Sequence, residues 1–416
     1  MSSKKRVLLL AVKEALAALD LRERVAAALP RAPLRVRVVA IGKAAPAMAL
    51  GALDAWNDAI EGVLVVAPDG LSAQERLRDR RVVLLRASHP LPDARSVDAA
   101  ERTLEFVAAE EESPRPQPMT ERRSPRALPE SRAPSRPPMI LILISGGASA
   151  LVCAPPAGVS LATKRKVTLA LLRSGATVQE LNVVRKHLSR IKGGGLARAA
   201  QDHPIFTLVA SDVIGGTPAD VGSGPSVADA STVGEARRLL ARFAPKFVDL
   251  PLVRTPPKTH GRAVIVASPE ELAKLVAKKL DARLLRPSTA SVEELAREYI
   301  ELAGRLPRGS IVVRAAEPSV HVTKSKGRGG RSCHLAALVG RALPKRACFL
   351  AYATDGVDGV SGTGGALVHG GFASDETIAA ALARFDTGTL HRRAKTALPE
   401  RATGHNLADV HVLVGG

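Results

Sequence analysis

Residues 145–195 combine a small-residue loop with a run of basic side chains, a combination suited to holding an anion such as a phosphate. The loop 145–149 reads Ser-Gly-Gly-Ala-Ser and follows the apolar run 140–144, which predicts a buried parallel strand. Glycine lets the backbone approach a ligand closely, and the N–H groups of such a turn point toward the anion. An ordinary tight turn between a strand and a helix would have the same composition. The candidate binding residues here are Ser145, Gly146, Gly147 and Ser149.

The basic run lies on a predicted helix, 178–191. Asn182, Arg185, Lys186 and Ser189 follow one another at spacings that place them on one helix face, with Lys192 at its edge. Such a face is often simply solvated. Because the glycine loop lies in the same region of the sequence, we interpret both segments as parts of one anion site.

Three further polar residues directly follow predicted strands. Lys43 follows the strand 36–41, where an ammonium group can reach a phosphoryl group that is being transferred. His89 lies in a proline-stiffened loop and is a candidate anion contact, or a residue that stabilises a turn. Asp212 follows the strand 205–210 and is a candidate magnesium ligand, or an ordinary turn cap.

The C-terminal half contains two similar loops. Arg331 follows the glycine-rich loop 327–330, which can deliver a guanidinium group to a phosphate. Asp355 and Asp358 follow the buried strand 348–353 and can hold magnesium or accept a hydroxyl proton. Two plain Asp-Gly turns are the alternative interpretation. No Walker A sequence and no protein-kinase signature occurs in the chain.

The composition limits the classes of function. The chain has 416 residues, 46% of them hydrophobic, and a formal charge of +20. Aromatic residues make up only 2%, and the basic residues are spread along the chain, so nucleic acid is not an expected partner. We expect anionic small molecules instead. The apolar segments are too short to span a membrane, and the three cysteines match no metal-binding pattern, which favours reduced thiols in a cytoplasmic protein. We expect the protein to be a monomer or a homodimer.

Strands and helices alternate along the chain, which predicts an α/β fold with one parallel sheet in each half. The expected N-terminal domain covers 1–250 and the C-terminal domain covers 258–416, separated by the Pro-rich segment 251–257. The Pro- and Arg-rich segment 111–138 predicts a disordered insertion. Ligands of such folds bind at the carboxyl ends of the strands. Besides the elements named above, we expect helices at 7–29, 44–53, 96–110, 160–174, 232–243, 270–280, 292–303, 332–343 and 375–385, and strands at 62–66, 82–85, 263–267, 311–315, 319–323 and 410–414.

The ordered set of these segments resembles the type-2 glycerate kinases of the MOFRL family. The resemblance runs from about residue 35 to the C-terminus and rests on the segments 42–44, 89–93, 145–149, 182–195, 211–213, 223–225, 329–331, 354–359 and 403–406. It implies two Rossmann-like α/β domains with the active site in the cleft between them. It also implies the cofactors ATP and Mg²⁺, and the phosphorylation of D-glycerate or a related hydroxy acid, at the 2-hydroxyl for glycerate.

The resemblance also assigns roles. Lys43 and Arg331 would stabilise the transferred phosphoryl group, and Asp355 would act with them in catalysis. Asp212 and Asp358 would bind metal, whereas the loop 145–149, the basic run and His89 would bind substrate or nucleotide. Some similar proteins are described as hydroxypyruvate reductases, but no Gly-x-Gly-x-x-Gly pattern follows the first strands of this chain.

The chain departs from the family pattern at several positions. Residues 332–334 are Ser-Cys-His where the family has Asn-Gln-Glu, glycine stands at 215 and 216 where the family has an aspartate, and His405 replaces a threonine. These departures leave an alternative function, a catalytically impaired relative that binds a nucleotide or a sugar acid.

Overall fold

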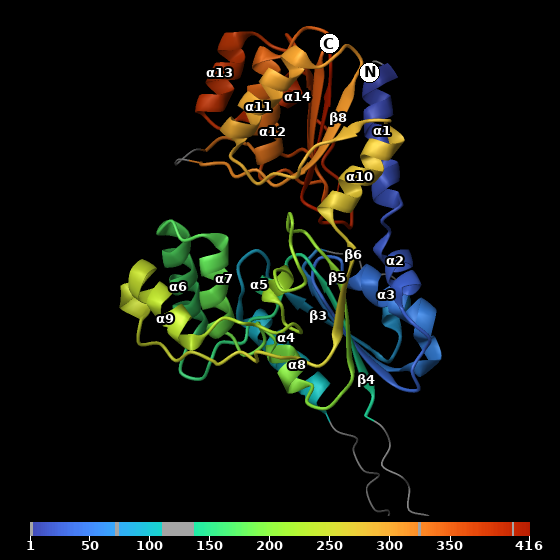
Figure 1. The fold of residues 1–416 in the computed structure, drawn as a ribbon, viewed down its shortest axis with the longest axis vertical. Coiled ribbons are helices and arrows are strands. Elements are labelled where there is room, and N and C mark those ends of the chain that lie inside the picture. Colours follow the sequence, from blue (N-terminus) through green and yellow to red (C-terminus); the bar gives the residue numbers. More distant parts are fainter. Residues whose placement is uncertain (1–2, 71–74, 110–136, 323–325, 402) are drawn as a thin grey trace, which may run out of the picture.

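The computed structural model describes residues 3–70, 75–109, 137–322, 326–401 and 403–416. The insertion that we expected to be disordered, 111–138, lies outside the described residues except for its last two. The chain forms two α/β halves, one above the other in Figure 1, and each half has its own sheet. The predicted α/β fold class is therefore confirmed. Within these ranges, no helix is both long and apolar enough to cross a membrane.

The first sheet has six parallel strands in the order β3-β2-β1-β4-β5-β6. Helices cover both of its faces. Alternate side chains of β1 enter two different cores, with Val38 facing α2 and α3 and Val39 facing α4. The strands are β1 (Val36–Ile41), β2 (Ile60–Pro68), β3 (Val82–Ala87), β4 (Met139–Ser145), β5 (Ile205–Ala210) and β6 (Arg262–Ala267), and the helices are α2 (Leu21–Ala28), α3 (Ala45–Trp56), α4 (Ala94–Ala108), α5 (Ala148–Leu151) and α8 (Gly195–Ala199).

The strand order places the loop after β1 next to the loop after β4. From β1 the chain builds outward through β2 and β3, and then returns to the other side of β1 as β4. The loops after β1 and β4 therefore leave the sheet next to each other at the point where the strand order reverses. In open α/β sheets this point is where ligands bind.

Strand β6 belongs to the first sheet, because it pairs in parallel with β5. We had expected 263–267 in the second half, after a boundary at the Pro-rich segment 251–257. That segment instead packs within the first half, where the Val253 N–H donates to the His187 carbonyl and the Pro256 carbonyl accepts from the Asp229 N–H.

The second sheet has five strands in the order β10-β9-β11-β8-β7 and is mixed rather than parallel. Strand β11 runs antiparallel to both of its neighbours, so its first residue, Asp409, lies opposite Ala353 at the end of β9 and Ala316 at the end of β8. Three strand ends thus meet at one edge. The strands are β7 (Arg283–Leu284), β8 (Ile311–Ala316), β9 (Cys348–Ala353), β10 (Gly365–His369) and β11 (Asp409–Val414).

The sequence did not predict β7 or β10, and one predicted strand was wrong. The described part of 319–323 makes only a single bridge, between Ser319 and Ser291. The sheet is covered by α10 (Pro269–Lys279) on one face and by α11 (Val292–Arg305) and α12 (Arg331–Ala342) on the other, with α13 (Asp375–Ala383) and α14 (Thr387–Arg393) outside α12.

The expected helix 7–29 is broken into α1 (Ser3–Ala17) and α2 at Asp20, whose carboxylate accepts from the N–H groups of Arg22 and Glu23 and so begins a new helix. Figure 1 shows α1 beside α10 in the second half and α2 beside α3 in the first. Glu14 and Lys279 form an ion pair of 2.8 Å between α1 and α10. The N-terminal helices therefore pack against both halves.

Three helices form a separate unit beside the first sheet: α6 (Leu161–Arg173), α7 (Val178–His187) and α9 (Val233–Phe243). They share their own apolar core, which includes Val167, Val184 and Leu240. Helix α7 ends four residues earlier than we predicted, so Lys192 lies in a turn beyond it and not at the edge of its polar face.

His391 on α14 makes the stability of the second half sensitive to acid. Its ring is buried, with Nε2 2.9 Å from the Cys333 carbonyl and Nδ1 2.8 Å from the Thr396 hydroxyl. Burial lowers the pKa of His391 to about 4. Because the unfolded chain takes up this proton near pH 6.5, about 3 kcal/mol of stability is present above that pH and is lost as the pH falls toward 4.

We therefore expect the variant His391→Gln to show a smaller drop in melting temperature between pH 7.5 and pH 4.5 than the parent protein. The exposed His260 provides the matched control, since His260→Gln should keep the full drop. Parallel pH profiles for His391→Gln and the parent would contradict the assignment.

Candidate functional site

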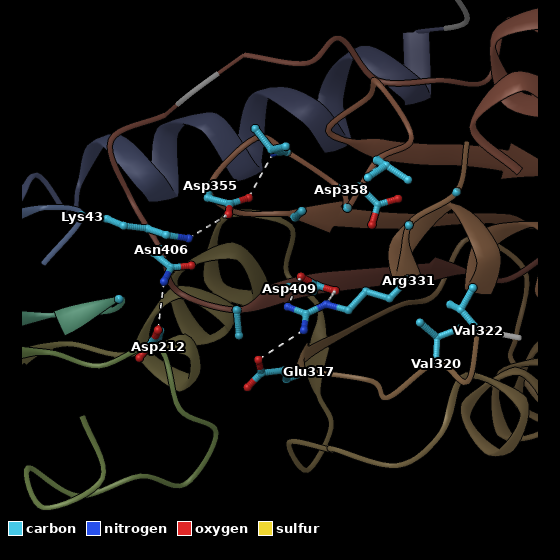
Figure 2. Close-up of a pocket in the computed structure, with 18 of the residues that line it drawn as sticks. Lys43, Asp212, Glu317, Val320, Val322, Arg331, Asp355, Asp358, Asn406 and Asp409 are labelled. Carbon is cyan, nitrogen blue, oxygen red and sulfur yellow. Dashed lines mark hydrogen bonds and ion pairs between the residues drawn. The ribbon is translucent and has the colours of Figure 1, made fainter. Parts of the chain in front are cut away.

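A cleft of about 610 Å³ lies between the carboxyl-terminal edge of the first sheet and the edge of the second sheet where β8, β9 and β11 meet. Residues from both halves line it. In Figure 2, Lys43 and Arg331 extend into it from opposite sides. The titratable and amide residues that line the cleft are Lys43, His89, Asp212, Glu317, Arg331, Asp355, Asp358, Asn406 and Asp409.

The loop that carries Lys43 is fixed to the loop after β4. The Lys43 N–H donates to the Gly146 carbonyl at 2.9 Å, and the Ala44 N–H donates to the Ser145 hydroxyl at 3.0 Å. A side chain at Gly42 would begin 2.1 Å from that hydroxyl, and its φ of +135° also favours glycine. Ser145 was expected to bind a ligand; it is buried and holds the Lys43 loop in place instead.

The ammonium group of Lys43 reaches across to the second half of the chain. Its Nζ lies 3.6 Å from the Asp355 carboxylate, and about 29% of each side chain is exposed, so both can be reached from the cleft. His89 lies behind them against Gly147, where burial and the charge of Lys43 lower its pKa. A neutral imidazole can accept or donate one hydrogen bond, but it adds no charge for holding an anion.

Asp212 and Asn406 make a second link between the two halves. The Asn406 amide donates to the Asp212 carboxylate at 2.9 Å (Figure 2). Gly146 passes close beside both, and a Cβ there would lie 2.2 Å from an Asp212 oxygen. Burial and the nearby Glu317 raise the pKa of Asp212 to about 6. A half-buried carboxylate of this kind is stabilised by a cation that neutralises it.

Arg331, the first residue of α12, is held by two carboxylates. It makes two parallel hydrogen bonds of 2.8 and 2.9 Å to the buried Asp409 and a third of 3.2 Å to Glu317. Ser332 also donates to Asp409, at 3.1 Å. Burial opposes the charge of Arg331, but Asp409 and Glu317 outweigh it and raise its pKa, so the guanidinium group remains charged.

The burial and the hydrogen bonds of Asp358 do not favour the metal-binding role that we expected for it. It is buried, and its two oxygens accept from the N–H groups of Ser332 and Cys333 at 2.9 and 2.8 Å. Gly330 lies so close that a Cβ would meet the carboxylate at 2.3 Å. Asp358 therefore caps the start of α12, where unpaired N–H groups and the helix dipole stabilise a negative charge.

A second pocket, of about 320 Å³, adjoins the cleft and shares Gly147 and Asp212 with it. We call it the Ser149 pocket. The Ser149 hydroxyl accepts from Arg185 at 2.7 Å and from Lys192 at 2.7 Å, and it lies 3.2 Å from the Ser223 hydroxyl. Its lining residues are Gly147, Ser149, Gln179, Asn182, Arg185, Asp212, Val213, Ile214, Gly215, Gly216, Asp220, Gly222 and Ser223.

The basic run therefore divides into two groups. Arg185 and Lys192 converge on Ser149, and Asn182 lines the same pocket. Lys186, which we expected beside them, pairs with the buried Asp229 at 3.1 Å and does not line the pocket. Lys186 thus fixes the loop around Asp229. The predicted basic face is therefore divided between the Ser149 pocket and this loop.

Two charged lining residues, Glu317 and Asp409, were not predicted from the sequence. Glu317 directly follows β8 and lies between the two strands that we expected at 311–315 and 319–323. Asp409 was placed just outside the last strand, although it begins β11. The rule that had identified Lys43 and Asp212, a polar residue at a strand end, would have identified Glu317.

Comparison with known proteins supports the fold and the family. The family model "Domain of unknown function (DUF4147)" matches residues 7–251, and the "MOFRL family" model matches residues 310–409. The chain is 30% identical over 390 residues to the D-glycerate 2-kinase of Thermotoga maritima, covering 88% of this chain and 87% of that protein. It is 36% identical over 368 residues to an Agrobacterium vitis protein that carries a provisional name as a hydroxypyruvate reductase, covering 82% and 77%.

Comparison with solved structures supports the same fold and family. A crystal structure of the glycerate kinase from Thermotoga maritima matches with a TM-score of 0.82 and 26% identity, covering the whole of both chains. A protein from Pyrococcus horikoshii matches in fold, with a TM-score of 0.72 and 23% identity, covering 100% of this chain and 99% of that chain. The chain therefore belongs to the MOFRL family of glycerate kinases.

Proposed function

We propose that this protein transfers the γ-phosphoryl group of ATP to D-glycerate, at the 2-hydroxyl, and gives 2-phosphoglycerate and ADP. One observation carries the proposal. Lys43 from the first half and Arg331 from the second line one cleft that also holds the carboxylates of Asp212 and Asp355. Phosphoryl transfer needs little covalent chemistry from a protein, but it needs fixed cations around the moving group and a carboxylate for the acceptor hydroxyl.

Each charged group has a role in this reaction. The glycerate 2-oxygen forms a bond to the γ-phosphorus, and the bond between that phosphorus and the bridging oxygen of ADP breaks. Asp355 accepts the hydroxyl proton, and Lys43, 3.6 Å from it, holds the carboxylate in place and contacts the transferred group. Arg331 is kept charged and oriented by Asp409 and contacts the same group from the opposite half.

The cleft also fits Mg²⁺ bound with the nucleotide. The described residues contain no group of three or more His, Cys, Asp or Glu side chains that could hold a metal by themselves. Magnesium in kinases needs only one or two carboxylates, with phosphate oxygens and waters completing its shell. Asp212 is the better placed ligand, because its half-buried carboxylate lines the cleft and only one of its oxygens accepts a hydrogen bond from Asn406. When bound, the ion would neutralise phosphate charge.

The departures from the family pattern at 332–334 do not favour the alternative of a binding protein. None of these three residues lines the cleft. Cys333 is buried against Thr363, and His334 is buried against Phe385, whereas Ser332 supports Asp409. The side chains that we assign to the reaction are all present.

The test is a coupled assay of ADP release with D-glycerate, ATP and Mg²⁺, followed by phosphorus NMR of the product. We expect turnover with 2-phosphoglycerate as the product. If ATP raises the melting temperature but no hydroxy acid is phosphorylated, the binding-protein alternative replaces the proposal. NADH oxidation with hydroxypyruvate would instead point to a reductase.

A further inference from the structure

Lys164 on α6 is a buried cation that no role described above explains. Its side chain is 7% exposed, and its Nζ has no hydrogen-bond partner among the described residues. Taking an ammonium group out of water without a partner is costly, so such a group is retained only where something compensates it. Burial and Arg185 lower the pKa of Lys164, and the nearby Cys153 thiol opposes this shift.

Lys164 is close enough to Arg185 and Lys192 for their charges to repel one another, and its helix α6 packs on α7, which carries Arg185. Arg185 and Lys192 both donate to the Ser149 hydroxyl, and Lys192 is fully buried, so that burial, Arg185 and Lys164 together hold its pKa well below the usual range. In the part of the chain that the structure describes, none of these three cations forms an ion pair with a carboxylate. The protein thus gathers basic groups whose charged forms a negatively charged ligand would stabilise.

The hydrogen bonds leave a position for that ligand. The two lone pairs of the Ser149 hydroxyl are used by Arg185 and Lys192, so its proton is free to be donated, either to Ser223 at 3.2 Å or to an incoming oxygen. Two carboxylates also line the pocket. Asp212 stands at its junction with the cleft, and Asp220 is exposed and already accepts from the Thr217 N–H and hydroxyl at 2.8 Å. The positive charge is therefore concentrated at the Ser149 end.

The cleft and the Ser149 pocket differ in size and in lining, and this difference indicates which substrate each one binds. The cleft is roughly twice as large as the Ser149 pocket, and it has an apolar wall that includes Val320, Val360 and Phe385 and suits a nucleoside. The Ser149 pocket has only Val213 and Ile214 as large apolar residues. It fits a small acid whose charged end meets Arg185 and Ser149 and whose other end extends toward Asp212 and Gly147 at the cleft.

We infer that the Ser149 pocket is the carboxylate subsite for the acceptor acid, and that Lys164, with Lys192, supplies charge that positions Arg185 and Ser149 against that carboxylate. The inference rests on the proposed function. It makes Lys164 a residue that selects a hydroxy acid over a neutral polyol, since a polyol brings no charge to balance the cations. The nucleotide then lies in the cleft, and the acceptor hydroxyl faces it at the junction of the two pockets.

The test compares Lys164→Met with Lys166→Met, a matched control on the exposed side of the same helix. In Lys164→Met we expect the KM for D-glycerate to rise by about tenfold or more, with the KM for ATP changed by less than about twofold, because only the acid loses a charge partner. The melting temperature of the ligand-free variant should not fall, since methionine fills a similar volume without an unpaired charge. Lys166→Met should match the parent in all three measurements.

Calorimetry without nucleotide separates this inference from the proposed function. D-glycerate and L-lactate should bind to the parent and to Lys166→Met, bind much more weakly to Lys164→Met, and glycerol should bind to none of them. This result would stand even if the parent showed no turnover, in which case the proposed function alone would fail. A rise in the KM for ATP with the KM for D-glycerate unchanged would place nucleotide phosphates in the pocket and overturn the inference. Equal binding of glycerate to all three proteins would overturn it as well.

Discussion

Replacement of Lys43 by methionine should lower kcat for the phosphorylation of D-glycerate by about 10²- to 10³-fold, the usual effect of removing one preorganised group that stabilises a transition state. The Lys43 ammonium lies at the point where the loops after β1 and β4 leave the sheet, 3.6 Å from Asp355. Methionine keeps the length of the side chain but carries no charge. We therefore expect a loss in kcat with a small change in KM, since the interaction belongs mainly to the transition state.

The fold should not be affected by this change. The Lys43 loop is held by backbone groups, through the bonds to Gly146 and Ser145, and not by the ammonium group. The melting temperature of Lys43→Met should thus equal that of the parent. Lys258→Met removes an exposed lysine that does not line the cleft and should retain full turnover. If Lys43→Met kept most of the parent kcat, Lys43 would not contact the transferred group, and the assignment of this cleft would be wrong.

Replacement of Arg331 by methionine should abolish turnover and also destabilise the protein, by about 3–5 kcal/mol, the range seen when one partner of a buried ion pair is removed. Asp409 is 1% exposed and receives two hydrogen bonds from Arg331. Without the guanidinium group its carboxylate would remain buried with only Ser332 as a donor. A clearly lower melting temperature is the expected measurement.

A second substitution separates the structural effect from the catalytic one. In the double variant Arg331→Met/Asp409→Asn the buried Asp409 charge is gone, and only Glu317, whose side chain is about 40% exposed, loses its partner, so most of the melting temperature should return. Turnover should not return, because the cation that faces Lys43 across the cleft is still absent. Recovery of activity in the double variant would show that Arg331 acts only through the stability of the second half.

The sequence predicted a site residue correctly where its side chain stays at the end of the strand that it follows, and failed where the side chain binds a distant element. Lys43, Asp212 and Asp355 were identified because each follows an apolar run that forms a strand, and strand ends collect ligands in this kind of fold. Asp358 follows the same strand as Asp355, yet its carboxylate caps α12. Its spacing from Asp355 is a local property, but the helix that it caps begins 27 residues earlier in the chain.

The basic run shows the same limit. A helical period from 178 to 191 would place Lys186 and Arg185 on one surface, and the period cannot show that the helix ends at His187 or that Asp229 pairs with Lys186. Lys164 gave no signal in the sequence, because a lysine on a helix is usually exposed and only the packing of α6 buries it.

By itself, then, the sequence determined the α/β class, the strands of the first sheet and the strand-end residues Lys43, Asp212 and Asp355, since residues that are neighbours in the chain specify an apolar run and the turn that follows it. It also carried the ordered segments that identify the family. Only the tertiary structure decided that β6 belongs to the first sheet, that β11 runs antiparallel and brings Asp409 to Arg331, and that Arg185 and Lys192 meet at Ser149. These are pairings between residues far apart in the chain, and no local period or propensity specifies them.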